Sequence, residues 1–244
     1  MTTPPRTSPS PDLDLGQAFR FFFEDPDWIK KMLIGAVFML LSSLIIGGIF
    51  VGGYAVHIVR RVARGEPRPL PEWEDLGAFF GDGLRAFALY LVHLVVVGIV
   101  PAAFAFLLFL MGGGLAAFSH SSRSASDAAG ALVGLLMAGL YAVTLVLMLL
   151  LSIYIPAAFV RFVVTDRLGA GFEIAENIAF IRRNLGRYAL ALVIYLLASF
   201  VAQVGFLACC VGYLATSFWA VCVGAWALGE VARRDAMIVP ALLR

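Results

Sequence analysis

Two histidines and three cysteines are the side chains within the apolar parts of this chain that could carry chemistry. His57 lies near the end of one apolar block, His93 lies inside the next, and Cys209, Cys210 and Cys222 lie in the last. Ionisable groups inside a membrane bind ions, relay protons or activate water. Neither histidine has a carboxylate, cysteine or second histidine at a spacing typical of a metal site or a proton relay. We therefore interpret His93 as a hydrogen-bonded packing residue and the cysteines as small apolar helix residues.

Other recognisable chemistry is missing from the sequence. It contains no phosphate-binding loop, nucleophile elbow or nucleotide fingerprint. Gln203 is the second candidate polar residue within the membrane, beside His93, and side chains of this kind can form interhelical hydrogen bonds worth about 0.6 kcal/mol each. The sequence predicts a protein that is not an enzyme, without catalytic residues, metal or cofactor.

The composition predicts a helical membrane protein. Of its 244 residues, 61% are apolar and only 14% are charged, whereas soluble domains carry about 25% charged residues. Four runs contain no Asp, Glu, Lys or Arg: 32–59, 86–111, 131–160 and 188–229. Each exceeds the roughly 20 residues that cross the hydrocarbon core of a bilayer. The expected fold class is all-α, a polytopic helical membrane bundle.

The length of each run predicts how often it crosses the membrane. Run 188–229 would form a helix of roughly 60 Å, twice the thickness of the core. We expect it to turn near Cys209–Gly212, which gives the apolar blocks 188–208 and 210–229. Blocks 86–111 and 131–160 would cross once each.

The basic residues predict the orientation. Of the 18 Lys and Arg residues, 17 can be placed on one side of the membrane, and only Arg123 must lie on the other. Short basic loops stay in the cytoplasm, so we expect a multi-pass protein of the cell inner membrane with both termini in the cytoplasm. The net charge of +2 gives no reason to expect nucleic acid as a partner; the basic side would face the anionic lipids of the bilayer.

The first apolar block, 32–59, is ambiguous. Its 28 residues would form a helix of about 42 Å, too long for one flat crossing and too short for two. Basic residues lie on both flanks, with Lys30 and Lys31 before the block and Arg60 and Arg61 after it. We favour a short or re-entrant helical hairpin, broken around Gly47–Gly48 or Gly52–Gly53, over a single tilted span. The bundle would then consist of three cytoplasm-facing hairpins, about four full spans plus this shorter pair.

The remaining segments complete the expected organisation. Residues 1–13 are rich in Pro, Ser and Thr and are expected to form a disordered cytoplasmic tail, with residues 14–244 forming a single integral membrane domain. Residues 15–24 and 169–187 have the pattern of amphipathic helices at the membrane interface. The second could equally be a cytoplasmic helix packed against the bundle.

A series of spaced motifs fills the first 85 residues: Asp25-Pro26-Asp27-Trp28, Lys31, Gly35, Gly53-Tyr54, Arg60, Arg61, Gly65-Glu66, Leu70-Pro71-Glu72-Trp73, Asp75 and Asp82-Gly83. The series resembles domain of unknown function 4013, DUF4013, a family of bacterial and archaeal integral membrane proteins. Beyond residue 90 the resemblance is one of hydropathy. It implies an integral membrane protein and attaches no activity and no catalytic residue to the chain.

The loop at 60–85 and the turn before the first block collect charge, aromatic rings and turn residues beside the membrane. The candidate interaction surface consists of Asp25, Trp28, Arg60, Arg61, Arg64, Glu66, Pro71, Trp73 and Asp75. It can be a docking surface for a partner or a lipid headgroup, or an anchored linker that obeys the positive-inside rule. Asp25 or Asp27 is expected to cap the helix that starts near Trp28, and Gly53 is expected to permit close helix contact.

Two functions remain after these exclusions. The first is a non-enzymatic protein with a membrane-organising or partner-associating role, together with protein partners or in a homo-oligomer. The alternative is a transporter or channel-like protein for a small uncharged solute, because interrupted helices often line solute sites. Pro101, Pro156 and the broken first block motivate this alternative.

Overall fold

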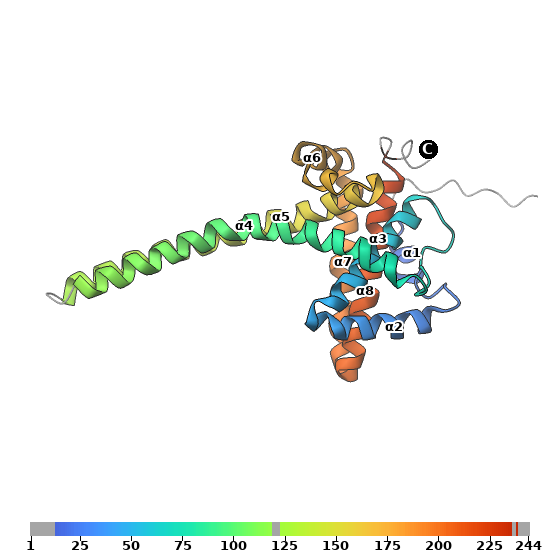
Figure 1. Cartoon of the computed structure of the whole chain (residues 1–244), viewed down its shortest axis with the longest axis horizontal. Coiled ribbons are helices and arrows are strands. Elements are labelled where there is room, and N and C mark those ends of the chain that lie inside the picture. Colours follow the sequence, from blue (N-terminus) through green and yellow to red (C-terminus); the bar gives the residue numbers. More distant parts are fainter. Residues whose placement is uncertain (1–12, 119–122, 236–237, 239–244) are drawn as a thin grey trace, which may run out of the picture. The chain divides into compact units, whose positions relative to one another are not determined.

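The computed structural model of the protein describes residues 13–118, 123–235 and 238. Every regular element within these residues is a helix. The expected all-α fold class is confirmed for this part of the chain. Along the chain the elements are α1 (Leu15–Arg20), α2 (Trp28–Leu41), η1 (Ser42–Leu44), α3 (Ile46–Ala63), α4 (Leu76–Phe118), α5 (Arg123–Thr165), η2 (Leu168–Phe172), α6 (Ile174–Arg183), α7 (Leu185–Val204), η3 (Gly205–Ala208) and α8 (Cys209–Arg233) (Figure 1).

Within the described residues, five helical segments are long and apolar enough to cross a membrane: Ile46–Ala63, Leu76–Leu107, Ala131–Thr165, Leu185–Leu207 and Gly212–Arg233. The last four correspond to the predicted blocks from 86–111 onwards. α2 has 14 residues, about 21 Å of helix, which is shorter than the hydrocarbon core. The chain is therefore a helical membrane protein with several candidate spans.

The chain divides into two compact units. One comprises Tyr90–Ile155, and the other comprises Met1–Leu89 together with Pro156–Arg244. In the smaller unit the ring of His93 in α4 lies 5.4 Å from that of Tyr154 in α5. Most of its described large apolar side chains are exposed, as expected for helices that face lipid.

α8 forms the centre of the larger unit, where it packs against α2, α3 and α7. α3 and α4 also approach each other closely. A Cβ atom at Gly53 would overlap the carbonyl oxygen of Phe79, and one at Gly83 would overlap that of Ile49. The expectation that Gly53 permits close helix contact is confirmed.

The first apolar block is interrupted, but at a different place from the one expected. α2 ends at Leu41, and α3 begins at Ile46 after a 3-10 turn. Ser42 and Ser43 donate hydrogen bonds to the carbonyls of Phe38 and Leu40, both at 2.9 Å, so the hydroxyls satisfy backbone groups that the break frees. The break predicted at Gly47–Gly48 or Gly52–Gly53 is wrong, because those glycines lie within α3.

The other predicted boundaries shift by a few residues. The turn expected near Cys209–Gly212 is the 3-10 segment η3, and α8 already begins at Cys209. The side-chain surroundings of Cys209 and Cys210 lie outside the described residues. Cys222 is fully buried in the core, as expected of a small apolar helix residue.

The two segments expected at the membrane interface bury side chains in the larger unit. Phe22, just after α1, is fully buried, as is Phe180 in α6. Leu13, which the prediction placed in the N-terminal tail, is also buried at 4% exposure. Residues 1–12 lie outside the described part, so the disordered tail stays a prediction.

Candidate interaction site

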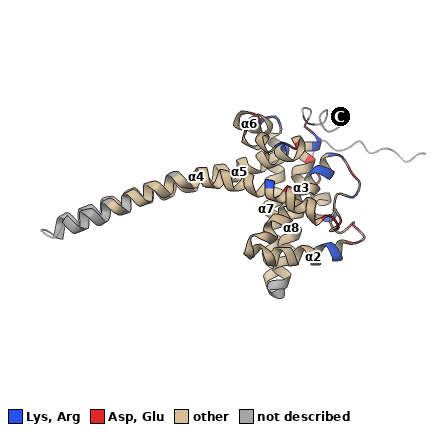
Figure 2. Ribbon diagram, in the orientation of Figure 1, with Lys and Arg blue, Asp and Glu red and all other residues tan. Residues whose placement is uncertain are grey.

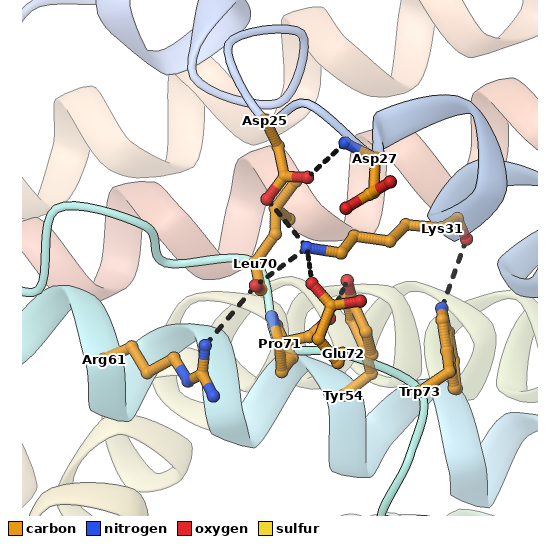
Figure 3. A network of polar contacts seen from close by, with 9 residues as sticks. All are labelled: Asp25, Asp27, Lys31, Tyr54, Arg61, Leu70, Pro71, Glu72 and Trp73. Carbon is orange, nitrogen blue, oxygen red and sulfur yellow. Dashed lines mark hydrogen bonds and ion pairs between the residues drawn. The ribbon is translucent and has the colours of Figure 1, made fainter.

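A buried lysine network joins the turn before α2 to the loop between α3 and α4 (Figure 3). Lys31 lies in the first turn of α2 and its side chain is 2% exposed. Its Nζ atom lies 2.7 Å from Asp25 Oδ2 and 2.6 Å from Glu72 Oε1. It also donates a hydrogen bond to the carbonyl of Leu70 at 3.3 Å. A buried charge is tolerated only when it is paired and hydrogen-bonded, so these contacts fix the loop against α2.

Two aromatic residues of the motif series strengthen the same junction. The rings of Tyr54 and Trp73 stack with their centroids 4.4 Å apart and an interplanar angle of 18°. Tyr54 Oη donates a hydrogen bond to the carbonyl of Pro71 at 3.0 Å, and Trp73 Nε1 donates one to the carbonyl of Lys31 at 3.2 Å. The loop 64–75 is thereby held on α2 and α3 by stacked rings, by a hydrogen bond from Tyr54 of α3 to the loop backbone and by one from Trp73 of the loop to the backbone of α2.

Leu70 brings together the two ends of the first apolar block. Its carbonyl oxygen accepts hydrogen bonds from Lys31 Nζ at 3.3 Å and from an Arg61 guanidinium nitrogen at 3.4 Å. Lys31 belongs to the beginning of α2 and Arg61 to the last turn of α3 (Figure 3). The beginning of α2 and the end of α3 therefore lie close together.

A second polar cluster surrounds the end of α3. An Arg60 guanidinium nitrogen lies 3.0 Å from Asp82 Oδ2 of α4, and another lies 3.3 Å from Asp166 Oδ1, just after α5. Arg85 lies 3.7 Å from Asp82 and 3.6 Å from Asp166. His57 Nε2 lies 3.2 Å from the same Asp82 carboxylate. The spacing of residues around His57 in the sequence does not reveal this carboxylate, because it comes from the following helix.

The charged residues of the larger unit gather at helix ends and in the connecting loops (Figure 2). Further ion pairs join Arg161 to Glu173 at 2.8 Å and Arg183 to Asp235 at 3.6 Å. Such pairs hold neighbouring elements together where the chain emerges from the apolar helices. Charges at helix ends can reach water or headgroups, which is the distribution that a membrane environment requires.

The residues of the predicted interaction surface divide into buried and exposed groups. Asp25 and Pro71 are buried, Trp28 and Trp73 are partly buried, and all four serve the junction or its aromatic surroundings. Arg60 and Arg61 are partly exposed, whereas Arg64, Glu66 and Asp75 are exposed. The exposed part of the surface is therefore the rim of the loop.

The expected capping of α2 takes a different form. Asp27 stands at the N-cap position, but its side chain makes no capping hydrogen bond. Asp25 accepts the N–H of Asp27 at 2.9 Å and directs its second oxygen to Lys31. Asp75 does act as a cap, because its Oδ1 accepts the N–H of Ala78 at 2.9 Å in the first turn of α4.

The two candidate polar residues within the membrane lie apart from this junction. His93 belongs to the smaller unit and contacts Tyr154. Gln203 is exposed in the last turn of α7. Among the described residues, no group of three or more His, Cys, Asp or Glu side chains is arranged to hold a metal ion.

Comparison with known proteins adds one finding. A family model described as a protein of unknown function, DUF4013, matches residues 36–211. This chain is a member of the DUF4013 family. The match extends well beyond residue 90, where the sequence interpretation found only a likeness of hydropathy. No curated protein and no solved structure matches the chain.

For this DUF4013 protein, sequence reasoning missed the central residues of the junction. Lys31, Tyr54 and Glu72 belonged to the motif series but not to the predicted surface. A lysine at the very start of an apolar block is the signal that points to Lys31, because only a buried partner allows it there. Asp82 and Asp166 gave no comparable signal, since their partners lie far away in the sequence.

Proposed function

We propose that this DUF4013 protein is a non-enzymatic membrane component that associates with other membrane proteins through the rim of its loop 64–75. The observation that carries the proposal is the fixed position of that loop. Lys31 of α2 pairs with Glu72 of the loop, and Tyr54 of α3 donates a hydrogen bond to the loop carbonyl of Pro71. Trp73 of the loop donates a hydrogen bond to the backbone of α2. A loop that serves only as a linker needs no such support.

A fixed loop binds a partner at lower entropic cost than a loop that must first become ordered. The rim presents exposed charged side chains of both signs to a partner: Arg64, Glu66, Arg68, Glu74 and Asp75. A pocket of about 230 Å³ lies beside them, lined in part by Arg68, Trp226 and Glu230. Exposed charges of both signs beside a pocket favour recognition of a specific partner surface over general attraction to lipid.

The same geometry supports a topology for the first apolar block. Lys31 and Arg61 reach one carbonyl oxygen, so we propose that α2 and α3 form a re-entrant pair with both basic flanks on one side. By the positive-inside rule this side is the cytoplasm of the cell. Both termini would then be cytoplasmic, and the pairs α4–α5 and α7–α8 would be the two full hairpins.

The alternative function, transport of a small uncharged solute, has weaker support. The interruption between α2 and α3 is the feature that motivated it, yet Ser42 and Ser43 occupy two carbonyls near the break. Carbonyls that are already satisfied are less suited to coordinating a solute. Uptake of a labelled solute by vesicles that contain the purified protein would support this alternative.

Site-specific photocrosslinking in cells tests the docking role. A photoreactive amino acid replaces Arg68 or Glu74 on the rim, and a matched control replaces Arg182, which is exposed on α6. We expect adducts with a defined protein or with a second copy of this chain at 68 and 74, and none at 182. Recovery of unlinked monomer at both rim positions, or equal adducts at 182, would refute the proposal.

A further inference from the structure

A basic pocket lies at the end of α3 and shares Arg64 and Glu66 with the rim of the loop. His57, Arg60, Arg61 and Arg64 line it from the last two turns of the helix, at spacings that place all four on one face. Val163 and Val164 of α5 and the neighbouring Asp166 form the facing wall. The pocket has a volume of about 410 Å³, which is large enough for a phosphate group and adjoining glycerol atoms.

The charges around the pocket do not balance. The arginines at 60, 61, 64 and 85 carry four positive charges, and the acids at 66, 82 and 166 carry three negative ones, so one positive charge is in excess. Arg60 is held between two carboxylates, at 3.0 and 3.3 Å. Arg61 donates a hydrogen bond to the carbonyl of Leu70 at 3.4 Å, and its carboxylate partner among the described residues, Glu66, lies at 3.7 Å. The side chain of Arg64 forms no ion pair or hydrogen bond with any residue that the structure describes, and only its backbone N–H is bonded, to the carbonyl of Arg60 at 3.1 Å.

One lining residue of the pocket, His57, has a buried ring nitrogen. His57 Nε2 is 3.2 Å from Asp82 Oδ2, but the geometry does not form a hydrogen bond. This atom has no other hydrogen-bond partner within the described part of the chain. Buried nitrogen atoms without a partner are rare in folded proteins. The pocket thus combines the Arg64 guanidinium, which has no side-chain partner among the described residues, with the His57 ring and an excess of one positive charge.

We propose that this pocket binds the phosphate of an anionic phospholipid. A phosphodiester carries one negative charge, which matches the excess, and its tetrahedral oxygens accept paired hydrogen bonds from guanidinium groups. The candidate spans end at Ala63 and Thr165, which places the pocket where headgroups lie. Its valine wall suits the apolar atoms next to the phosphate. Basic pockets between membrane helices bind such headgroups in other proteins.

The test uses the purified full-length protein in a mild detergent, with lipid binding measured by native mass spectrometry. The probes are phosphatidylglycerol, zwitterionic phosphatidylcholine and inorganic phosphate. Arg64→Gln removes the free guanidinium, and Arg182→Gln removes an exposed arginine elsewhere as a matched control. We expect the wild type to prefer phosphatidylglycerol, and Arg64→Gln to weaken this binding about tenfold, the loss of one charge-assisted hydrogen-bonding group.

The outcomes are distinct. Because the side chain of Arg64 makes no bonds within the described residues, Arg64→Gln should unfold at the same temperature as the wild type when no lipid is added. Equal weakening by both variants would overturn the proposal, as would equal binding of phosphatidylcholine. Inorganic phosphate that binds as tightly as the lipid would instead identify a site for soluble phosphate. None of these results depends on the crosslinks at 68 and 74, so the pocket and the docking role can fail separately.

Discussion

Replacing Lys31 by methionine removes the charge at the centre of the junction and keeps most of its apolar stem. In the intact protein, Nζ pairs with Asp25 at 2.7 Å and Glu72 at 2.6 Å. The Asp25 side chain is 6% exposed and that of Glu72 is 43% exposed. In the Lys31→Met variant the Glu72 carboxylate can turn toward water, whereas Asp25 stays buried without its cation.

The expected loss follows from this difference in exposure. Breaking a buried ion pair by removing one partner costs about 3–5 kcal/mol, because the remaining charge is uncompensated. An exposed partner adds little, so Glu72 is left out of the sum. We expect the free energy of unfolding to fall by about 3 kcal/mol, the low end of that range. Asp25→Asn combined with Lys31→Met removes the stranded charge and should recover at least about 1 kcal/mol of the loss.

The assay is equilibrium unfolding of the purified protein in mixed detergent micelles, followed by tryptophan fluorescence. Lys30→Met is the matched control, because Lys30 is the preceding residue and is exposed. Limited trypsin digestion gives a local readout, and Lys31→Met should speed cleavage after Arg64 as the loop detaches. If Lys31→Met destabilises no more than Lys30→Met and the loop stays resistant, the buried junction does not hold the loop.

Two further predictions concern the packing around the junction. Gly53→Ala should destabilise the protein by at least about 1–3 kcal/mol, because its Cβ would overlap the Phe79 carbonyl. Gly52→Ala, where no atom lies within 4 Å, should be neutral or slightly stabilising; equal melting temperatures for the two variants would contradict the close contact. Tyr54→Phe should cost about 1 kcal/mol through its lost hydrogen bond to Pro71, measured in the same unfolding assay. An unchanged midpoint would argue against that bond.

The helices of this protein could be predicted from length and hydropathy because a membrane leaves few alternatives to helical backbone. The interruption of the first block could not be located in the same way. Glycine pairs suggested it, yet Gly47 and Gly53 lie within α3. Glycine is needed at these two positions because a side chain would overlap backbone atoms of Phe38, Leu41 or Phe79. The interruption instead includes Ile45, whose φ of 68° is unfavourable for a β-branched residue.

The candidate site was predictable as a region and not as a set of contacts. Charge, prolines and tryptophans pointed to the loop after α3. The partners of Lys31 come from two different segments, at 25 and 72, and only the folded chain brings them together. His57 is a similar case, because Asp82 approaches it from another helix. Spacing within one segment carries no information about such contacts.

Cysteine accessibility in whole cells and inverted vesicles tests the central claim, that both ends of the first apolar block lie on one side of the membrane. Single cysteines replace Lys30, Arg64 or Ser121 in a chain whose three native cysteines are changed to alanine. A membrane-impermeant maleimide should label positions 30 and 64 only in inverted vesicles, and position 121 only in whole cells. Labelling of positions 30 and 64 from opposite sides would contradict the account.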